Sequence, residues 1–314
     1  MGEFDLIQRW FSALGARRGD VVLGVGDDAA VVELPSGQQL VAAVDTLVAG
    51  RHFPADSPPR SIGHRALAVN LSDLAAMGAE PRFALLALTL PGADDAWLQE
   101  FAGGFGALAQ QHGVALIGGD TTSGALTISV TVLGCVLPGR ALTRSGARPG
   151  DLVFVSGTPG DAAAGLPLAD RPAPTAALRA RFEYPTPRVA LGRALAGIAS
   201  ACIDLSDGLA GDLGKIGAAS GCAIELQPAL LPVSEALRAL HALPRAQELA
   251  LTGGDDYELA FTVPAASAEL AAAARSAHTR ITRIGRVVPG TGVWLRDGAL
   301  VTEFAHRGFD HFGP

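Results

Sequence analysis

Apolar and polar positions follow two different spacings along the chain, and each spacing predicts a different kind of element. The run at 83–90 and the alternation at 125–136 are typical of strands. The longer stretches at 61–77 and 94–113 are typical of helices. Over the first half, the pattern predicts helices at 4–14, 61–77 and 94–113 and strands near 21–24, 29–34, 39–45, 83–90, 114–119 and 125–136.

The segment PGRALTRSGARPGD (138–151) is rich in Pro, Gly and Arg and is the best candidate for a domain boundary. We therefore expect domains at 1–138 and 139–314. Neither half shows the regular βαβ alternation of a doubly wound parallel sheet, which favours α+β for both. For the second half we expect helices after Gly160 and at 187–198, 208–219 and 265–276, with strands at 151–157, 201–204, 222–227, 257–263, 281–287 and 292–296.

Composition narrows the class of protein. The chain has 314 residues, 49% of them hydrophobic, which suits two domains with substantial cores. It has neither an apolar run of membrane-spanning length nor a basic start before an apolar core, so we expect a cytoplasmic protein without a membrane partner. The net charge of −7 argues against nucleic-acid binding. Its three scattered cysteines form no CxxC pair, so neither a disulfide framework nor a zinc site is indicated.

The stretch LGVGDDAAVV places Asp27 and Asp28 between a glycine turn and an apolar run. It loosely fits the dinucleotide fingerprint, but two carboxylates would repel a pyrophosphate at that position. Alone, it is better interpreted as an ordinary turn. Similar acidic residues in apolar or glycine frames recur, however, in VDTLVAGRHF, NLSDLAAMGA, LIGGDTT, IDLSDGLAGDL and TGGDDYEL.

Each of these acidic residues could cap a helix or hold a turn, but together they favour a shared explanation. Asp73 is the hardest to dismiss, because a carboxylate buried in the middle of a helix needs a partner. Divalent cations stabilise clustered carboxylates, and a set of oxygen ligands favours Mg²⁺ or Mn²⁺ over zinc or copper. The natural reason to gather Mg²⁺ is a polyanionic substrate such as ATP.

The standard nucleotide-binding motifs are absent. There is no GxxxxGK[ST] loop and no kinase HRD or DFG motif. Lys215 is the only lysine, so charge on the phosphates would come from Mg²⁺ and arginine. Arg144 and Arg148 in the linker are candidates, although a solvated linker is the better interpretation of Arg148.

The motifs GEFDLI, GVGDDAAV, DTLVAGRHF, ALAVNLSDLAAMGAEP, LIGGDTT, ALTRSGARPGD, SGTPGDAAAGL, IDLSDGLAGDLG, GGDDYEL and GFDHF occur in this order over nearly the whole chain. Together they resemble the thiamine-monophosphate kinase family, within a wider superfamily of ATP-dependent synthetases. The resemblance implies a two-domain, synthetase-like α+β fold, with the N-terminal domains of a homodimer pairing their strands in a shared barrel. It also implies direct, in-line transfer of the γ-phosphate of ATP to thiamine monophosphate, assisted by several Mg²⁺ ions and without a covalent nucleophile.

The resemblance carries roles over to particular positions. It implies ATP contacts at Gly119, Asp120, Arg144 and Ser206, and contacts to thiamine monophosphate at His52, Asp255 and Phe309. Contact with a metal near Val44 could come only through a backbone carbonyl. The implied Mg²⁺ ligands are Asp28, Asp45, Asp73, Asp120, Asp204 and Asp207, with Asp27 nearby.

The chain departs from the family pattern in three places, because Asp255 stands where Glu is frequent, Phe309 where Tyr is frequent, and Ala43 with Val44 where hydroxyl residues are frequent. Three alternatives stay open on the sequence. The chain could be another ATP-dependent synthetase of the superfamily, a nucleotide- or metal-binding module without turnover, or a Mg²⁺-dependent phosphatase. A steady-state assay of ADP formation that depends on thiamine monophosphate distinguishes an enzyme from a binding module without turnover.

Overall fold

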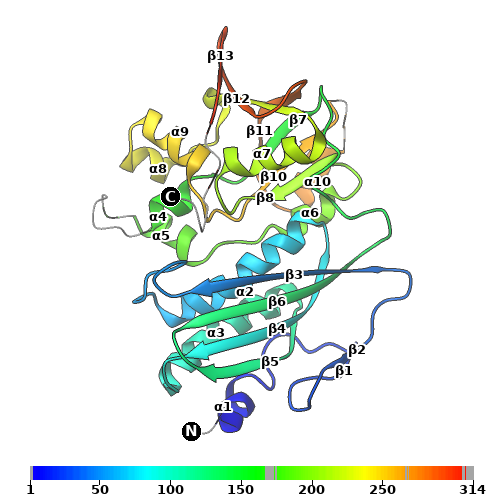
Figure 1. The fold of residues 1–314 in the computed structure, drawn as a ribbon, viewed down its shortest axis with the longest axis vertical. Coiled ribbons are helices and arrows are strands. Elements are labelled where there is room, and N and C mark those ends of the chain that lie inside the picture. The colour runs from blue at the N-terminus through cyan, green and yellow to red at the C-terminus, as the bar shows by residue number, and fades with distance from the viewer. Residues whose placement is uncertain are drawn as a thin grey trace. The chain divides into compact units, whose positions relative to one another are not determined.

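The computed structural model describes residues 3–166, 173, 175–265, 267, 269–305 and 308. The chain divides into two compact units, Met1–Leu74 with Ala79–Gly139, and Ala75–Gly78 with Arg140–Pro314. Each unit combines helices with one larger sheet, so the predicted α+β class is confirmed (Figure 1). The short segment Ala75–Gly78 groups with the second unit. The expected domains, 1–138 and 139–314, are continuous stretches of sequence and do not include such an exchange.

The first unit is built on a four-stranded sheet in the order β3-β6-β4-β5. Strand β6 is antiparallel to β3 and β4, whereas β4 and β5 are parallel and joined through α3. A separate hairpin, β1 with β2, carries the GVGDDA turn. The elements are α1 (Glu3–Trp10), β1 (Val21–Leu23), β2 (Val31–Val32), β3 (Gln39–Val48), α2 (Pro59–Ala76), β4 (Glu80–Leu90), α3 (Asp95–His112), β5 (Ala115–Ser123) and β6 (Thr127–Val136).

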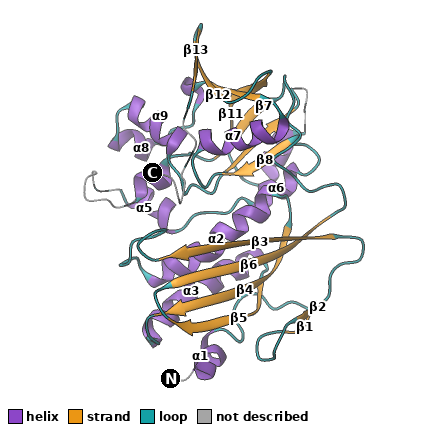
Figure 2. Cartoon of the chain, viewed as in Figure 1, coloured by secondary structure: helices purple, strands orange, loops and turns teal. Residues whose placement is uncertain are grey.

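Helices α2 and α3 lie on one face of this sheet (Figure 2). The Asp94 side chain begins α3 by accepting the amides of Ala96 and Trp97, which helix ends otherwise leave unsatisfied. The two helices approach closely, since a Cβ at Gly104 would stand 1.9 Å from the carbonyl oxygen of Arg60. The opposite face of the sheet retains exposed apolar side chains on β3, including Leu40 and Val44.

The second unit is built on a seven-stranded sheet in the order β13-β12-β9-β11-β7-β10-β8. All its neighbouring strands are antiparallel except β9 and β12. Its elements are β7 (Leu152–Ser156), α4 (Asp161–Gly165), α5 (Ala176–Glu183), α6 (Val189–Leu195), β8 (Ala201–Asp204), α7 (Leu209–Ser220), β9 (Ala223–Leu226), the 3₁₀ helix η1 (Pro228–Leu230), α8 (Glu235–Leu240), α9 (Leu243–Thr252), β10 (Leu259–Val263), α10 (Leu270–Ser276), β11 (Ile281–Val288), β12 (Val293–Asp297) and β13 (Leu300–Glu303).

Helix α7 packs on this sheet through an apolar face. Leu209, Leu213 and Ile216 are spaced by four and three positions and are fully buried in the same cluster as Val155 and Ile203. Because α7 follows β8 after only four residues, this packing also fixes the turn Leu205–Gly208.

Most elements lie where the sequence predicts them, with instructive exceptions. Helix α1 ends at Trp10 rather than at 14, and β2 has only two residues. Strands β3 and β5 extend beyond their predicted ends, so Asp45 lies inside its strand rather than at its end, and Asp120 lies inside a strand rather than after it. The sequence analysis missed α5, α8, α9 and β13. No helix among the described residues is both long and apolar enough to cross a membrane.

Candidate active site

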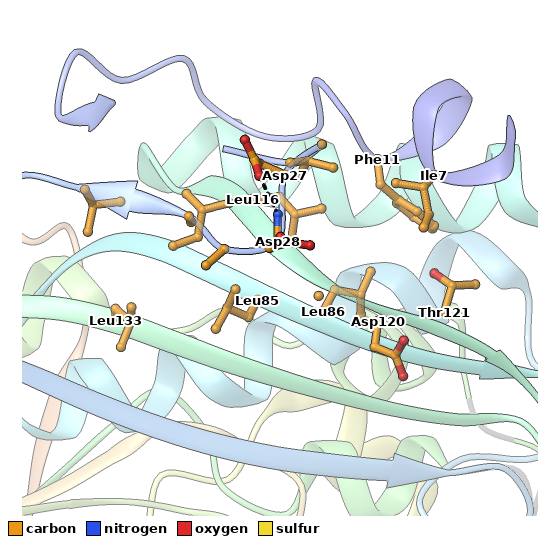
Figure 3. A pocket seen from close by; sticks show the side chains of 18 residues that line it. Ile7, Phe11, Asp27, Asp28, Leu85, Leu86, Leu116, Asp120, Thr121 and Leu133 are labelled. Atoms are coloured by element: carbon orange, nitrogen blue, oxygen red, sulfur yellow. Dashed lines mark hydrogen bonds between the residues drawn. The ribbon is translucent and has the colours of Figure 1, made fainter. Parts of the chain in front are cut away.

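A pocket of about 830 Å³ lies within the first unit, between the sheet and the segment that carries GVGDDA. Its floor is apolar and includes Leu85 and Leu86 of β4 and Leu133 of β6. Figure 3 shows Asp27 and Asp28 on the covering segment and Asp120 with Thr121 on β5. The pocket thus combines an apolar floor with three carboxylates from two separate segments.

The covering segment is anchored just before β1. Asp20 accepts hydrogen bonds from Arg18 (Nε to Oδ1, 2.8 Å) and from Arg82 of β4 (Nη1 to Oδ2, 2.6 Å). The hydrogen bond from Arg18 is the main reason why the pKa of Asp20 is lowered. Further along, the amide of Asp28 donates to Oδ1 of Asp27 at 2.8 Å, and both side chains are exposed. The anchor therefore ties the acidic turn to the sheet.

Strand pairing positions Asp120. Gly119 lies so close to β4 that a Cβ there would stand 1.8 Å from the carbonyl oxygen of Leu86. Its φ of 153° also lies in a region that other residues rarely adopt. Only glycine fits at 119, which explains why Asp120 follows a glycine. The close approach brings the exposed Asp120 to the edge of the pocket.

Asp45 and Asp73 do not line this pocket. The amide of Asp45 in β3 donates to Oδ1 of Asn70 at 2.8 Å, and Nδ2 of Asn70 donates to the carbonyl of Ala66 at 2.9 Å. The expectation of a buried carboxylate at 73 is wrong, because Asp73 is half-buried whereas Asn70 is fully buried. The polar side chain of α2 that accepts the Asp45 amide is thus the neutral amide of the buried Asn70, not the carboxylate of Asp73.

His52 lies in the loop after β3, and Val44 lies within that strand. The amide of Val48 donates to Nδ1 of His52 at 3.0 Å, so a neutral ring carries its proton on Nε2. The ring can therefore donate a hydrogen bond through Nε2. The side chain of Val44 is 60% exposed.

In the second unit, four candidate residues gather around the turn after β8. Asp204 ends the strand and is buried, and Ser206 and Asp207 follow it in the turn. The amide of Asp255 donates to the carbonyl of Ser206 at 3.0 Å, which brings the GGDDYEL segment to the same turn. The tail returns here too, since a Cβ at Gly308 would stand 3.1 Å from Cβ of Asp207. Phe309 lies outside the described residues.

Two residues that the sequence analysis did not assign hold this turn. Oδ2 of the fully buried Asp212 accepts the amides of Ser206 and Asp207, each at 3.1 Å. Nζ of Lys215 lies 2.6 Å from Oδ2 of Asp207 and 2.8 Å from Oδ1 of Asp212. Burial raises the pKa of Asp212, although Lys215 acts against this. Burial alone would lower the pKa of Lys215, but its two carboxylate partners raise it.

Asp255 has an unusual backbone. Its φ is +70° and that of Tyr257 is +50°, both in the left-handed region that is costly for most side chains. Aspartate tolerates this region better than glutamate, which gives a physical reason for the shorter acid at 255. The Tyr257 hydroxyl lies 3.2 Å from Oδ1 of Asp255 and stabilises its orientation.

The neighbouring acids of GGDDYEL are structural. Asp256 accepts the amides of Gly160 and Ala162, at 2.7 and 3.2 Å, and burial raises its pKa well above the usual range. Glu258 is fully buried and accepts hydrogen bonds from Arg181 and from Nε of Arg188, each at 2.6 Å. Burial would raise the pKa of Glu258, but Arg188 first and then Arg181 lower it.

The linker arginines differ in their surroundings. Oγ of Ser220 donates to the carbonyl of Arg144 at 3.2 Å and accepts the amide of Gly146, also at 3.2 Å. Arg144 therefore lies in a loop that is tied to the end of α7, with its side chain exposed. Arg148 is also exposed, and its amide donates to Oδ2 of Asp151 at 3.0 Å.

The structure thus forms two separate groups from the candidate residues. Asp27, Asp28, Gly119 and Asp120 share the pocket of the first unit, while Asp204, Ser206, Asp207 and Asp255 surround one turn of the second. Among the described residues, no group of three or more His, Cys, Asp or Glu side chains forms a ready metal centre. Within that same part of the chain, no basic side chain pairs with Asp27, Asp28 or Asp120. These exposed carboxylate oxygens are chemically suited to Mg²⁺.

Comparison with known proteins adds the family. The model of the AIR synthase related protein N-terminal domain matches residues 26–136, and that of the C-terminal domain matches 148–297. The thiamine-monophosphate kinase of Escherichia coli O157:H7 is 46% identical over 321 residues, covering 99% of this chain and 98% of the relative. That of Bacillus subtilis is 38% identical over 327 residues, covering 99% and 100%. The chain belongs to the thiamine-monophosphate kinase family.

Solved members of this kinase family have the same fold. The thiamine-monophosphate kinase of Stenotrophomonas maltophilia K279a is 48% identical with a TM-score of 0.83, covering 89% of this chain and 92% of that one. AaThiL complexed with AMPPCP and TMP is 34% identical with a TM-score of 0.77, covering 92% of each chain. The family resemblance that the sequence motifs indicated is therefore confirmed over nearly the full length.

Proposed function

We propose that this kinase phosphorylates thiamine monophosphate to thiamine diphosphate with ATP as the co-substrate. Thiamine-monophosphate kinases match it over nearly their full length, and one such relative has been solved with AMPPCP and TMP. The observation that carries the proposal is the pocket where Asp28 and Asp120 present carboxylates without a cationic partner among the described residues. Such a site needs an external cation before it can accept a phosphate.

The reaction proposed is a direct, in-line transfer. An oxygen of the thiamine monophosphate phosphate attacks the γ-phosphorus of ATP, a new P–O bond forms, and ADP leaves with the electrons of the broken bond. Because the acceptor oxygen is already anionic, neither a strong general base nor a covalent nucleophile is needed. Positioning and charge neutralisation then supply most of the rate enhancement.

Carboxylates of the acidic motifs would hold several Mg²⁺ ions. When bound, Mg²⁺ neutralises charge on the phosphates during transfer. The exposure of Asp27, Asp28, Asp45 and Asp120 supports this role, since their oxygens are accessible to a hydrated ion. We assign the ligands to Asp28, Asp45, Asp73, Asp120, Asp204 and Asp207, with Asp27 and the carbonyl of Val44 close by.

The remaining candidate residues would position the substrates. We assign ATP contacts to Gly119, Asp120, Arg144 and Ser206, and contacts to thiamine monophosphate to His52, Asp255 and Phe309. The Nε2 proton of His52 suits a phosphate oxygen, because Nδ1 already accepts the Val48 amide. Asp255 suits the pyrimidine amine or the thiazolium cation, and the ring of Phe309 suits stacking on a heteroaromatic ring.

We further propose a homodimer in which the first units pair. The supporting observation is the sheet face opposite α2 and α3, where Leu40 is 49% and Val44 is 60% exposed. The nearby β1–β2 hairpin adds Val22 and Val31, which are 63% and 50% exposed. Large exposed apolar side chains gathered in one region are typical of protein interfaces. Sedimentation velocity of the purified protein distinguishes a dimer from a monomer.

A coupled assay tests the activity directly. The protein is incubated with Mg²⁺, ATP and thiamine monophosphate, and thiamine diphosphate is followed by chromatography with free thiamine as the control acceptor. Product from the monophosphate alone is expected. ATP binding without thiamine diphosphate would instead support another synthetase reaction of the superfamily or a binding module without turnover.

A further inference from the structure

Lys215 is the only lysine of the chain, and it lies on α7 beside a proposed metal ligand. Its ammonium nitrogen is 2.6 Å from Oδ2 of Asp207 and 2.8 Å from Oδ1 of Asp212. The Asp207 side chain is 28% exposed, whereas that of Asp212 is fully buried. One ammonium thus joins a carboxylate that a metal could reach to one that solvent does not reach.

Asp212 has a separate task. Its Oδ2 accepts the amides of Ser206 and Asp207, so it fixes the backbone of the turn rather than offering a free oxygen. A buried carboxylate needs a compensating charge, and Lys215 supplies it. Lys215 can therefore remain on Asp212 whether or not its contact with Asp207 persists.

Charges of both signs lie close together around this turn. Asp204 at the end of β8, Asp207 in the turn and Asp212 in α7 place three carboxylates in this region, and the ammonium of Lys215 contacts the last two. A divalent cation approaching Asp207 meets a positive charge already bonded to one of its two oxygens. The repulsion between the ammonium and a cation bound to the same carboxylate is substantial, because the effective dielectric constant near a protein surface is lower than in bulk water.

We propose that Lys215 is a built-in competitor of the divalent cation at Asp207. Its ammonium balances the carboxylates of the turn while no metal is bound, and it weakens metal binding to the second unit. This inference rests on the proposed function in one respect, namely that Asp204 and Asp207 bind the metal.

Mn²⁺ binding to the nucleotide-free protein tests the competition, with free Mn²⁺ measured by electron paramagnetic resonance. The site in question is the one that Asp204→Asn removes. Lys215→Met should bind Mn²⁺ about tenfold more tightly there, because one positive charge is lost and an oxygen of Asp207 is released. Lys215→Arg keeps the charge and should stay close to the unsubstituted protein.

Asp212 provides the complementary control. Asp212→Asn removes a negative charge and should weaken Mn²⁺ binding, whereas combining it with Lys215→Met restores the original charge balance. The double variant should therefore bind Mn²⁺ more weakly than Lys215→Met alone and more tightly than Asp212→Asn alone. An affinity that does not follow this order of net charge overturns the competition.

Thermal unfolding separates competition from simple structural support. Lys215→Met should have a lowered Tm in EDTA, and Mg²⁺ should raise its Tm more than it raises that of the unsubstituted protein. An equal loss of Tm with and without Mg²⁺, with unchanged Mn²⁺ affinity, overturns the inference and leaves the kinase proposal intact. Failure of Asp204→Asn to remove any Mn²⁺ site would instead refute the metal role of this turn itself.

Discussion

The carboxylates in the pocket of the first unit and those around β10 of the second unit differ in what faces them. Asp27, Asp28 and Asp120 are exposed and meet no basic side chain in the part of the chain that is described. Glu258 is fully buried between Arg181 and Arg188. The first group keeps its negative charge available for an added cation, whereas Glu258 is already neutralised by the fold.

This difference separates two uses of acidic residues that look alike in a sequence. A carboxylate with internal cations stabilises the fold, and removing it leaves buried charges without partners. An exposed carboxylate without a partner contributes little to folding, so its position is better explained by binding. Substitutions in the two groups should therefore have opposite effects on activity and stability.

The largest effect is expected at Asp120. Asp120→Asn should lower turnover of thiamine monophosphate by about 10³-fold, because a charged oxygen at the proposed phosphate site is lost. Its free energy of unfolding should change by less than about 0.5 kcal/mol, since the side chain is exposed. Steady-state kinetics and urea denaturation measure the two effects. Asp297→Asn, an exposed acid on β12, serves as the matched control. Unchanged turnover in Asp120→Asn would exclude β5 from the active site.

Glu258→Gln should show the reverse pattern. It leaves Arg181 and Arg188 without their carboxylate, and the free energy of unfolding should fall by about 3 kcal/mol in urea denaturation. Its neighbour Asp255 is half-buried, so Asp255→Asn is the control, with a much smaller loss of stability and a larger rise in KM for thiamine monophosphate. Equal stability losses in the two variants would contradict the distinction between carboxylates that stabilise the fold and carboxylates that bind ligands.

The anchor at Asp20 should give an intermediate effect. Asp20→Asn weakens charged hydrogen bonds from Arg18 and Arg82, so about 1.5 kcal/mol of stability should be lost. Hydrogen exchange across 21–32 should speed up, because the segment that carries Asp27 and Asp28 is less firmly tied to the sheet. Arg9→Gln breaks the exposed Arg9–Asp95 ion pair and should change neither quantity appreciably. Unaltered exchange in Asp20→Asn would show that the segment is held by other contacts.

The smallest effect should appear in the pH dependence of stability. The pKa of Glu258 is lower in the folded protein than its usual value of 4.5, so the unfolded chain binds its proton first as the pH falls. The contribution of Glu258 is therefore complete above about pH 4.5 and is lost as the pH drops through the lower folded value. Glu258→Gln should lose less stability than the unsubstituted protein over that window, as measured by urea denaturation at each pH. Parallel curves for the two proteins would contradict the assignment.

The sequence predicted much of the fold because its spacing is local. The long helices α2 and α3 and the strands β4 and β6 follow directly from runs of apolar residues. Asp204 at the end of β8 could likewise be placed, since a strand and a helix flank it closely. The sequence shows the glycine before Asp120, but the reason for that glycine is the close approach of β4, which residue spacing does not reveal.

Partners that are distant in the sequence could not be predicted. Glu258 meets arginines that stand 77 and 70 positions away, and nothing in GGDDYEL separates it from Asp255. Glu258 and Asp255 differ because β10 pairs with β7 and β8, which buries the Glu258 end of the segment. Asp73 illustrates the same limit. Its apolar sequence neighbours predicted that it is buried, but Asp73 is only half-buried and Asn70 is the buried residue.

The left-handed backbone at Asp255 and Tyr257 limits which residues could replace Asp255, the proposed acceptor contact. β-Branched or long side chains at position 255 would strain the backbone of this turn even in the unliganded protein. A library of variants at 255 would therefore consist mostly of destabilised proteins. Aspartate, asparagine and glycine are the residues that this conformation accepts at low cost. If the proposed role of Asp255 holds, acceptor preference is more readily changed at the residues around Asp255 than at Asp255 itself.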